Sequence, residues 1–171
     1  RDSRITKYDR VGNAVEVVNA LGIYSTSKYG YFHTLPKYQV QNSKFNQSYY
    51  TGFEDPSHTL TVSAGTAATS TNSEAHTGDK LISVTTNSAE MEIPIVVQNG
   101  ERYIVSAWIK TDEDTYDYSQ APGLTAGSRG VRLEFYNEDR SSNFGESAIL
   151  EPSGPIIEGW QKVEGFVEIQ P

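Results

Sequence analysis

The chain has 171 residues, a formal net charge of −8 and no cysteine, enough for one domain with an appendage or for one larger all-β domain. The acidic balance argues against binding to nucleic acid or to an anionic membrane surface, because both reward clustered lysine and arginine. Without cysteine the fold must be held by core packing, with or without a metal. The 11 tyrosines, with frequent Thr, Ser, Asn and Gly, favour strands and turns, so the sequence predicts an all-β protein.

Neither a membrane span nor a leader sequence is visible. No apolar run approaches the roughly 20 residues that cross a bilayer, and the first residues lack the apolar stretch of a signal peptide. We therefore expect no membrane insertion. The chain begins with Arg1 rather than methionine, which indicates a piece of a longer protein.

The N-terminal residues indicate a tight hairpin. Residues 5–10 approach a turn at Gly12-Asn13 and residues 14–18 leave it, and this Gly-Asn pair supplies the positive φ angles of a tight hairpin turn. A short segment, 21–25, and an aromatic cluster, 29–32, follow.

The same residues carry a resemblance. The pattern Tyr8-Asp9-x-x-Gly12-Asn13, closed by Gly22, resembles one YD repeat of the bacterial YD-repeat (Rhs-type) surface proteins. Three further pieces resemble the connector between such repeats and a following domain in very large secreted proteins of Bacteroidota: Gly22 to Ser25, Tyr29 to Tyr31, and Leu35-Pro36. The resemblance implies a scaffold role for residues 1–36, because each hairpin buries its face only against neighbours. Residues 37–48, polar with scattered aromatics, are predicted to be a linker.

The pair Asn99-Gly100 predicts a second hairpin, on which the remaining chain is organised. It is the pair best suited to a type I′ turn, and apolar residues alternate on both sides of it, over residues 90–97 and 101–110. The side predicted to face the core carries Met91, Ile93, Ile95 and Val97 before the turn and Tyr103, Val105, Ala107 and Ile109 after it.

The opposite side of residues 101–110 carries Ser106, Trp108 and Lys110. A large aromatic beside hydrogen-bonding and charged groups is what a sheet surface needs to hold a flat polar ligand. The alternative is that Trp108 is ordinary half-buried packing, and the sequence leaves both interpretations open.

A long loop and further strands complete the chain. Residues 111–129 have no core period and are expected to form a surface loop, and residues 137–146 a polar one. Strands are predicted at 130–136 and 159–169. In the first of these, Val131, Leu133 and Phe135 face the core, and Arg132, Glu134 and Tyr136 face away.

Five pieces of residues 49–171 resemble, in order, the jelly-roll carbohydrate-binding modules of the galactose-binding-like type. They are Gly52-Phe53-Glu54, the loop and strand from Glu74 to Val84, Tyr103 to Lys110, Val131 to Tyr136, and Gly159 to Val163. The resemblance implies a jelly-roll β-sandwich over residues 49–171. Those modules continue with a further strand, so the sandwich is expected to lack its final strand. That strand was trimmed, or lies beyond the ordered part, or comes from another chain by edge addition.

The resemblance also implies a structural calcium ion where the first strand of the module meets its glycine loop. The implied ligands are a carboxylate of Glu54, carbonyl oxygens of the loop 76–80, including Thr77 and Lys80, and a second carboxylate from Asp55 or Asp79. Such hard oxygen ligands suit calcium, which takes about six to eight of them. The alternative is that Glu54 and Asp55 merely cap a surface turn.

A ligand site is expected on the side of the sheet that faces away from the core. The candidate residues are Trp108, Lys110, Arg132, Glu134 and Tyr136, with Tyr116 and Tyr118 of the long loop closing over them. Sugar rings present C–H faces that stack on aromatics, and their hydroxyls need polar partners. The alternative for Arg132 and Glu134 is a cross-strand ion pair of little energetic worth.

The sequence favours binding over catalysis. His33, His58 and His76 lie in predicted loops without metal-binding spacing, and neither a GxSxG elbow nor a glycine-rich phosphate loop occurs. Carboxylates are abundant enough for a glycosidase pair, but a small sandwich without a deep cleft is a poor scaffold for acid–base chemistry.

We therefore predict a non-catalytic glycan-binding or adhesion module of a large secreted or cell-surface bacterial protein. Its expected partners are a glycan and other parts of the same protein or a surface or secretion complex. Two alternatives stay open. One is a purely structural sandwich in the repeat shell of an adhesin or polymorphic toxin, and the other is a protein interaction module that pairs through an open sheet edge.

Overall fold

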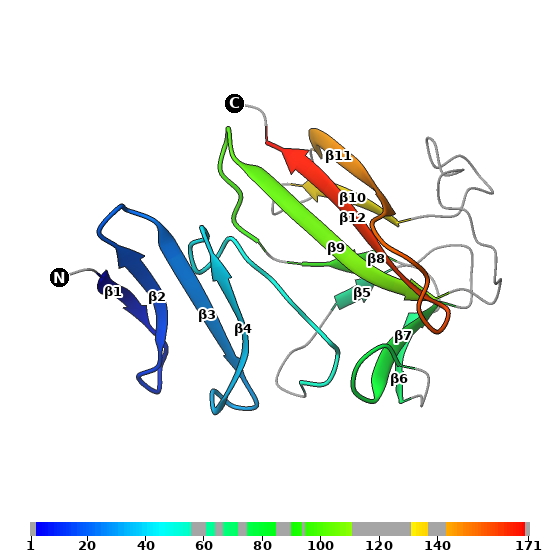
Figure 1. The fold of residues 1–171 in the computed structure, drawn as a ribbon, viewed down its shortest axis with the longest axis horizontal. Helices are drawn as coiled ribbons and strands as arrows, with labels where there is room; N and C mark the ends of the chain where they lie inside the picture. Colours follow the sequence, from blue (N-terminus) through cyan, green and yellow to red (C-terminus); the bar gives the residue numbers. More distant parts are fainter. Residues whose placement is uncertain are drawn as a thin grey trace. The chain divides into compact units, whose positions relative to one another are not determined.

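The computed structural model describes residues 3–55, 61–63, 67–71, 75–84, 90–93, 95–110, 131–136 and 143–169. These residues form strands, turns and loops without a helix, so the all-β prediction is confirmed (Figure 1). None of them belongs to a helix that is long and apolar enough to cross a membrane. The chain divides into two compact units, residues 1–96 and 97–171, and the boundaries predicted at 36 and 48 both fall within the first.

The first unit begins with a four-stranded antiparallel meander (Figure 1). Its strands pair in chain order: β1 (Ser3–Tyr8), β2 (Ala14–Asn19), β3 (Tyr24–Gly30) and β4 (Leu35–Gln41). The predicted N-terminal hairpin is the β1–β2 pair. Residues 37–41 of the predicted linker lie in β4, where they pair with β3.

The turn between β1 and β2 is held by Asp9. Its Oδ1 accepts the N–H groups of Val11 at 3.0 Å and Asn13 at 2.8 Å, and its carbonyl accepts the N–H of Gly12 at 3.2 Å. Gly12 has a φ of +94°, which glycine adopts without steric cost, whereas Asn13 is not among the residues with positive φ. The expectation that both residues of the Gly-Asn pair have positive φ is therefore wrong, because the Asp9 side chain organises a longer turn.

The next turn, between β2 and β3, is built in the same way, with Asn19 in the place of Asp9. Asn19 Oδ1 accepts the N–H groups of Leu21 at 2.9 Å and Ile23 at 3.0 Å. Its carbonyl accepts the N–H of Gly22 at 3.1 Å, and Gly22 has a φ of +79°. The chain thus contains two successive Asx-x-x-Gly turns, a short internal repeat that the sequence analysis missed.

Residues beyond β4 return to the sheet. The hydroxyl of Thr26, a fully buried residue of β3, donates to the carbonyl of Ser43 at 2.9 Å. The N–H of Phe45 donates to Glu16 Oε2 of β2 at 2.9 Å. Because Glu16 and Thr26 are cross-strand partners, both contacts lie on one face of the meander.

Two short strand pairs follow within the first unit. β5 (Thr61–Ser63) pairs with β8 (Glu90–Glu92), and β6 (Ala67–Thr71) pairs with β7 (Lys80–Val84), both antiparallel.

The second unit contains one four-stranded antiparallel sheet. Its strands are β9 (Arg102–Lys110), β10 (Val131–Tyr136), β11 (Asn143–Pro152) and β12 (Trp160–Glu168), in the spatial order β10-β11-β12-β9 (Figure 1). β11 includes residues 143–146, which were predicted to belong to a loop. The jelly-roll topology stays a prediction.

The hairpin predicted around Asn99-Gly100 does not form. β9 pairs with β12 over its whole length, and β8 pairs with β5. The turn itself exists, since the N–H of Glu101 donates to Gln98 O at 3.2 Å, but only Gly100 has positive φ (+79°), so it is not type I′. Pro94 interrupts the preceding run and has no N–H for a ladder.

The inward face of the second sheet is the apolar core of its unit. Leu150 and Val163 are almost fully buried, with exposed fractions of 2% and 0%. Around them pack Val105, Ala107, Ile109, Val131 and Leu133. The prediction of which residues of 103–109 and 131–135 face the core is therefore confirmed.

Candidate functional site

The outward face of the second sheet is the surface opposite this core. Exposure alternates along β9, and Trp108 is 39% exposed, so its indole is not sealed in the interior. Cross-strand partners of an antiparallel pair share a face. The register of β9 with β12 therefore gives five outward pairs: Arg102 with Glu168, Ile104 with Phe166, Ser106 with Glu164, Trp108 with Lys162, and Lys110 with Trp160.

Polar groups surround Trp108 on this face. Lys162 lies directly opposite it on β12, and Ser106 and Lys110 flank it on β9. Lys162 Nζ forms an ion pair with Glu164 Oε2 at 2.6 Å. An exposed indole thus lies beside hydroxyl, ammonium and carboxylate groups, the combination predicted for a flat polar ligand.

Trp160 belongs to the same end of the face, and the sequence analysis did not include it. It is half-buried and pairs with Lys110, which makes it a diagonal neighbour of Trp108. Both tryptophans of the chain therefore share one corner of one surface. The sequence could have predicted this position. Trp160 is an odd number of residues from the core residue Val163, and side chains alternate along a strand, so Trp160 faces away from the core.

A second polar cluster occupies β10. Arg132 Nη2 forms an ion pair with Glu134 Oε1 at 2.8 Å, and the hydroxyl of Tyr136 donates to Glu134 Oε2 at 2.6 Å. The structure thus brings these three predicted residues together. The ion pair runs along one strand rather than across two strands.

The β10 cluster and Trp108 lie on opposite edges of the sheet. β11 and β12 separate β10 from β9, a distance of about 14 Å at the usual spacing of strands. The outward pairs Arg132 with Ile149 and Glu134 with Ser147 put both groups on the same face, but one sugar ring does not reach both. The predicted loop residues Tyr116 and Tyr118 lie outside the described residues.

The predicted calcium ligand Glu54 does meet the glycine loop. Glu54 Oε1 accepts the N–H groups of Asp79 at 2.8 Å and Lys80 at 2.6 Å. Gly78 has a φ of +74°, and a β-carbon there would lie 2.6 Å from Glu54 Oε1, so only glycine lets the loop close over the carboxylate. The loop turns amide donors toward Glu54, whereas the calcium site required carbonyl oxygens. Thr77 and Asp79 are exposed.

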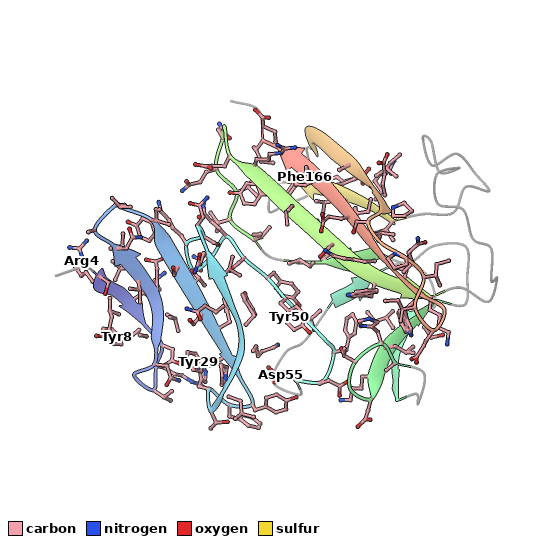
Figure 2. The ribbon with its side chains drawn as sticks, viewed as in Figure 1. Arg4, Tyr8, Tyr29, Tyr50, Asp55 and Phe166 are labelled. Atoms are coloured by element: carbon pink, nitrogen blue, oxygen red, sulfur yellow. The ribbon has the colours of Figure 1, made fainter. Side chains whose placement is uncertain are left out.

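Asp55, the alternative second carboxylate, belongs to a different contact. It is buried, and its Oδ2 lies 3.2 Å from Lys37 Nζ of β4, while the N–H of Tyr31 donates to Oδ1 at 3.4 Å (Figure 2). In the described part of the chain, no group of three or more His, Asp or Glu side chains could hold a metal ion. One carboxylate that already accepts two amides fits calcium poorly. The calcium site stays a prediction.

No protein-family model matches the chain, and neither a curated protein nor a solved structure matches it. The two family resemblances in the sequence therefore stay predictions. The geometry of the outward face is what supports a function.

The turn between β3 and β4 is a second unusual feature that the sequence did not predict. Tyr31, Phe32 and His33 have φ angles of +48°, +59° and +69°, which cost non-glycine residues on the order of 1–3 kcal/mol each. The turn is held from the first hairpin: Asn13 Nδ2 donates to His33 O at 2.8 Å, and His33 Nδ1 lies 3.0 Å from Asp9 Oδ2.

The Asp9 carboxylate at this junction has a shifted pKa. Burial raises the pKa of Asp9, but hydrogen bonds from the side chain and backbone of Asn13, from Val11 and from His33 outweigh burial and lower it from 3.8 to about 2. Asp9 therefore stays ionised and joins two neighbouring turns.

Proposed function

We propose that the chain is a non-catalytic glycan-binding or adhesion module of a large secreted bacterial surface protein, and that it binds sugar on the outward face of β9 and β12. The observation that carries the proposal is the exposed indole of Trp108, which stands on the side of the sheet opposite the aliphatic core. A ligand can therefore bind without disturbing the packing that holds the unit together.

The groups around Trp108 match the two kinds of surface of a sugar ring. The C–H face of the ring stacks on the indole, and its hydroxyls form hydrogen bonds with the groups beside it. Ser106, Lys162 and Glu164 supply a hydroxyl, an ammonium and a carboxylate on neighbouring outward positions. The outward positions of β9 and β12 form the side of a sheet, which suits one side of an extended polysaccharide.

The test is a glycan array probed with the wild-type chain and with Trp108→Ala. We expect binding to at least one glycan and a loss of about tenfold or more in the variant. Phe166→Ala is the matched control, because Phe166 is 50% exposed at the other end of the same face and of β12 (Figure 2). An array without any bound glycan, or equal binding by the Trp108 variant, would overturn the proposal.

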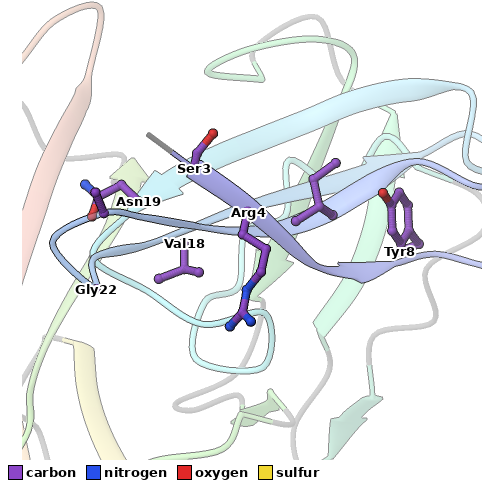
Figure 3. A pocket seen from close by; sticks show the side chains of 8 residues that line it. Ser3, Arg4, Tyr8, Val18, Asn19 and Gly22 are labelled. Atoms are coloured by element: carbon purple, nitrogen blue, oxygen red, sulfur yellow. The ribbon is translucent and has the colours of Figure 1, made fainter. Parts of the chain in front are cut away.

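A second candidate function, pairing with a protein strand, is favoured by the edge of the first sheet. All six residues of β1 are exposed, and a groove of about 790 Å³ runs beside β1 and β2, lined by Arg4, Ile5, Tyr8, Val18 and the turn at Asn19 (Figure 3). Other parts of the same large protein would be the partner. However, β1 has irregular pairing at Ile5–Tyr8 and carries Arg4 and Lys7, features that limit edge-to-edge pairing, so we place this function second.

Size-exclusion chromatography with light scattering tests this second candidate. If the edge pairs with a strand, the chain should self-associate or bind a β-hairpin peptide. Ile5→Pro should abolish this association, because proline has no N–H to donate and disturbs the edge. A monomer that binds no such peptide would exclude it.

A further inference from the structure

The contact between Lys37 and Asp55 holds an amine and a carboxyl group together away from water (Figure 2). Lys37 Nζ lies 3.2 Å from Asp55 Oδ2, and the two side chains are only 9% and 4% exposed. Lys37 belongs to β4, whereas Asp55 lies in the segment that follows this strand. Two groups fixed in contact react as if each were present at a very high concentration, because the cost of bringing them together is already met by the fold.

Gly30 of β3 leaves the space in which these two groups meet. A β-carbon on Gly30 would overlap Asp55 Oδ2 and lie 2.5 Å from Cδ of Lys37, so the contact depends on a glycine at this position. The N–H of the next residue, Tyr31, donates to Asp55 Oδ1 at 3.4 Å. Its φ of +48° is a strained value for tyrosine, and strain of this kind accompanies functional positions. One carboxyl oxygen of Asp55 therefore faces an amide donor, and the other faces the lysine nitrogen.

Lys28 places a second ammonium group near this pair. Burial lowers the pKa of Lys28, and the charges of Lys37 and Lys7 lower it further. A reaction that removes the charge of Lys37 would therefore relieve repulsion on Lys28. It would also remove the cost of keeping the ammonium and the carboxylate of the pair ionised away from water. The surroundings of the pair thus favour a neutral product.

We propose that Lys37 and Asp55 condense into an isopeptide bond between Lys37 Nζ and Asp55 Cγ. The contact in the structure is the state before condensation. The ammonium gives one proton to Oδ2, and the neutral amine attacks Cγ while negative charge develops on Oδ1, beside the Tyr31 N–H. A second proton moves from the nitrogen to Oδ2, the bond between Cγ and Oδ2 breaks, and one water molecule leaves. The pair itself supplies every atom and proton of this step.

Such a bond would stabilise the first unit in the way that a disulfide stabilises other small domains. The chain has no cysteine, and Val15 is the buried apolar residue in the described part of the first unit. A covalent link between residues 37 and 55 closes a loop and so limits the freedom of the unfolded chain. This role is independent of glycan binding.

The experiment is intact mass spectrometry of the purified whole chain, when fresh and after incubation under native conditions. We expect the mass of the wild-type chain to be lower than the sequence mass by one water molecule. After denaturation and digestion with trypsin, the chain should remain uncut at Lys37, and the peptide 29–44 should be joined to the peptide 45–80. Tandem mass spectrometry should place the link between Lys37 and Asp55.

Three variants test the chemistry of the bond. Lys37→Arg keeps a positive charge opposite Asp55 but has no amine that condenses, and Asp55→Ala removes the carboxyl group, so both should have their full sequence mass. The matched control is Lys28→Arg, which makes the same change at the neighbouring lysine and should still lose water. A folded wild-type chain with its full sequence mass after incubation would overturn the proposal. A loss of water that maps to other residues, or that persists in Lys37→Arg, would overturn it as well.

Discussion

The two units of the chain are stabilised by different kinds of contact. In the second unit, the described core is aliphatic and aromatic, with buried Phe135, Leu150, Val163, Val167 and Ile169. In the described part of the first unit, Val15 is the buried apolar residue, whereas the buried polar residues are Thr26, Ser43 and Asp55. The described part of the first unit therefore depends more on hydrogen bonds and charge pairs than on buried apolar area.

Phe45 illustrates how the first unit uses its apolar groups. Its ring has the ammonium of Lys28 at 4.1 Å and that of Lys7 at 5.0 Å from the ring centre, and its N–H binds Glu16. Burial and the nearby Lys37 and Lys7 lower the pKa of Lys28. Cation–π contacts of this kind contribute about 0.5–2 kcal/mol, comparable with burial of a small side chain. We therefore expect the stability of the first unit to be sensitive to changes of charge and to small steric clashes, and the stability of the second unit to be sensitive to side-chain volume.

The largest expected effect is loss of volume in the second core. Leu150→Ala should lower the free energy of unfolding of the second unit by about 2–5 kcal/mol, because it removes buried methyl groups and leaves a cavity. Tryptophan fluorescence during urea unfolding measures this unit selectively, since Trp108 and Trp160 both belong to it. The exposed Ile104→Ala is the control and should change little. An equal loss of amide protection in β2 and β3 would show that the units unfold together and would contradict the comparison.

The next largest effect is expected from adding a methyl group at Gly30 in the first unit. A β-carbon on Gly30 would overlap Asp55 Oδ2 and the stem of Lys37, the buried ion pair. Gly30→Ala should therefore destabilise the first unit by about 1–3 kcal/mol. The new methyl group forces Lys37 and Asp55 apart, which leaves each charge buried without its partner. Hydrogen exchange of β3 and β4 measures it, with tryptophan fluorescence unchanged. Gly154→Ala, which meets nothing within 4 Å, is the control. Protection equal to wild type would show that the ion pair is not tightly packed.

Faces of strands were predictable from the sequence, and strand partners were not. Alternation along residues 103–109 fixes which side chains face the core, since a one-residue slip would expose all of them. The partner of β9 is β12, about 50 residues further along the chain, and no local pattern encodes that choice. Asn99-Gly100 suggested a nearer partner, but the N–H of Val96 bonds to Asn46 instead of to a hairpin.

The candidate site was predicted only in part, because the sequence shows which face a residue lies on but not which strands are neighbours. Trp108 follows from parity along one strand, and Trp160 would have followed from the same rule applied to β12. That Arg132 lies about 14 Å from Trp108 depends on the order of strands, which parity does not give. Likewise, Glu54 was expected at the glycine loop, while the pairing of Asp55 with Lys37 is a long-range contact without a sequence signature.

A smaller effect should appear when the first unit is acidified. The pKa of Asp9 is about 2 in the folded chain against 3.8 for the free group, so its contribution to stability is complete above pH 4 and is lost as pH falls toward 2. Glu16, whose pKa is also lowered, adds to this loss. The protection of the amides of residues 3–41 against hydrogen exchange, taken relative to the intrinsic rate at the same pH, should therefore fall below pH 4, while the second core changes less.

Asp9→Asn isolates the carboxylate. The variant places an amide where Oδ2 accepts from Asn13 and faces His33, so it should exchange faster at neutral pH and show a flatter response to acid. The control is Asp79→Asn, an exposed carboxyl in another part of the same unit. An acid response that is equally steep in Asp9→Asn would assign the pH dependence to other groups.

The smallest effect is expected from a polar contact on the surface of the second unit. Arg132 and Glu134 are 2.8 Å apart, yet their side chains retain 45% and 22% exposure, so water can replace the partner that Arg132→Gln removes. The free energy of unfolding should change by less than about 1 kcal/mol. Glycan binding at Trp108 should be unaffected, because β10 is the opposite edge of the sheet.

Lys37→Gln makes the matched change in the buried pair of the first unit and should cost several times more, because it leaves Asp55 buried without its counter-charge. If the two variants cost the same, burial does not decide what a charge pair contributes here, and the contrast between the units would have to rest on their apolar contacts alone.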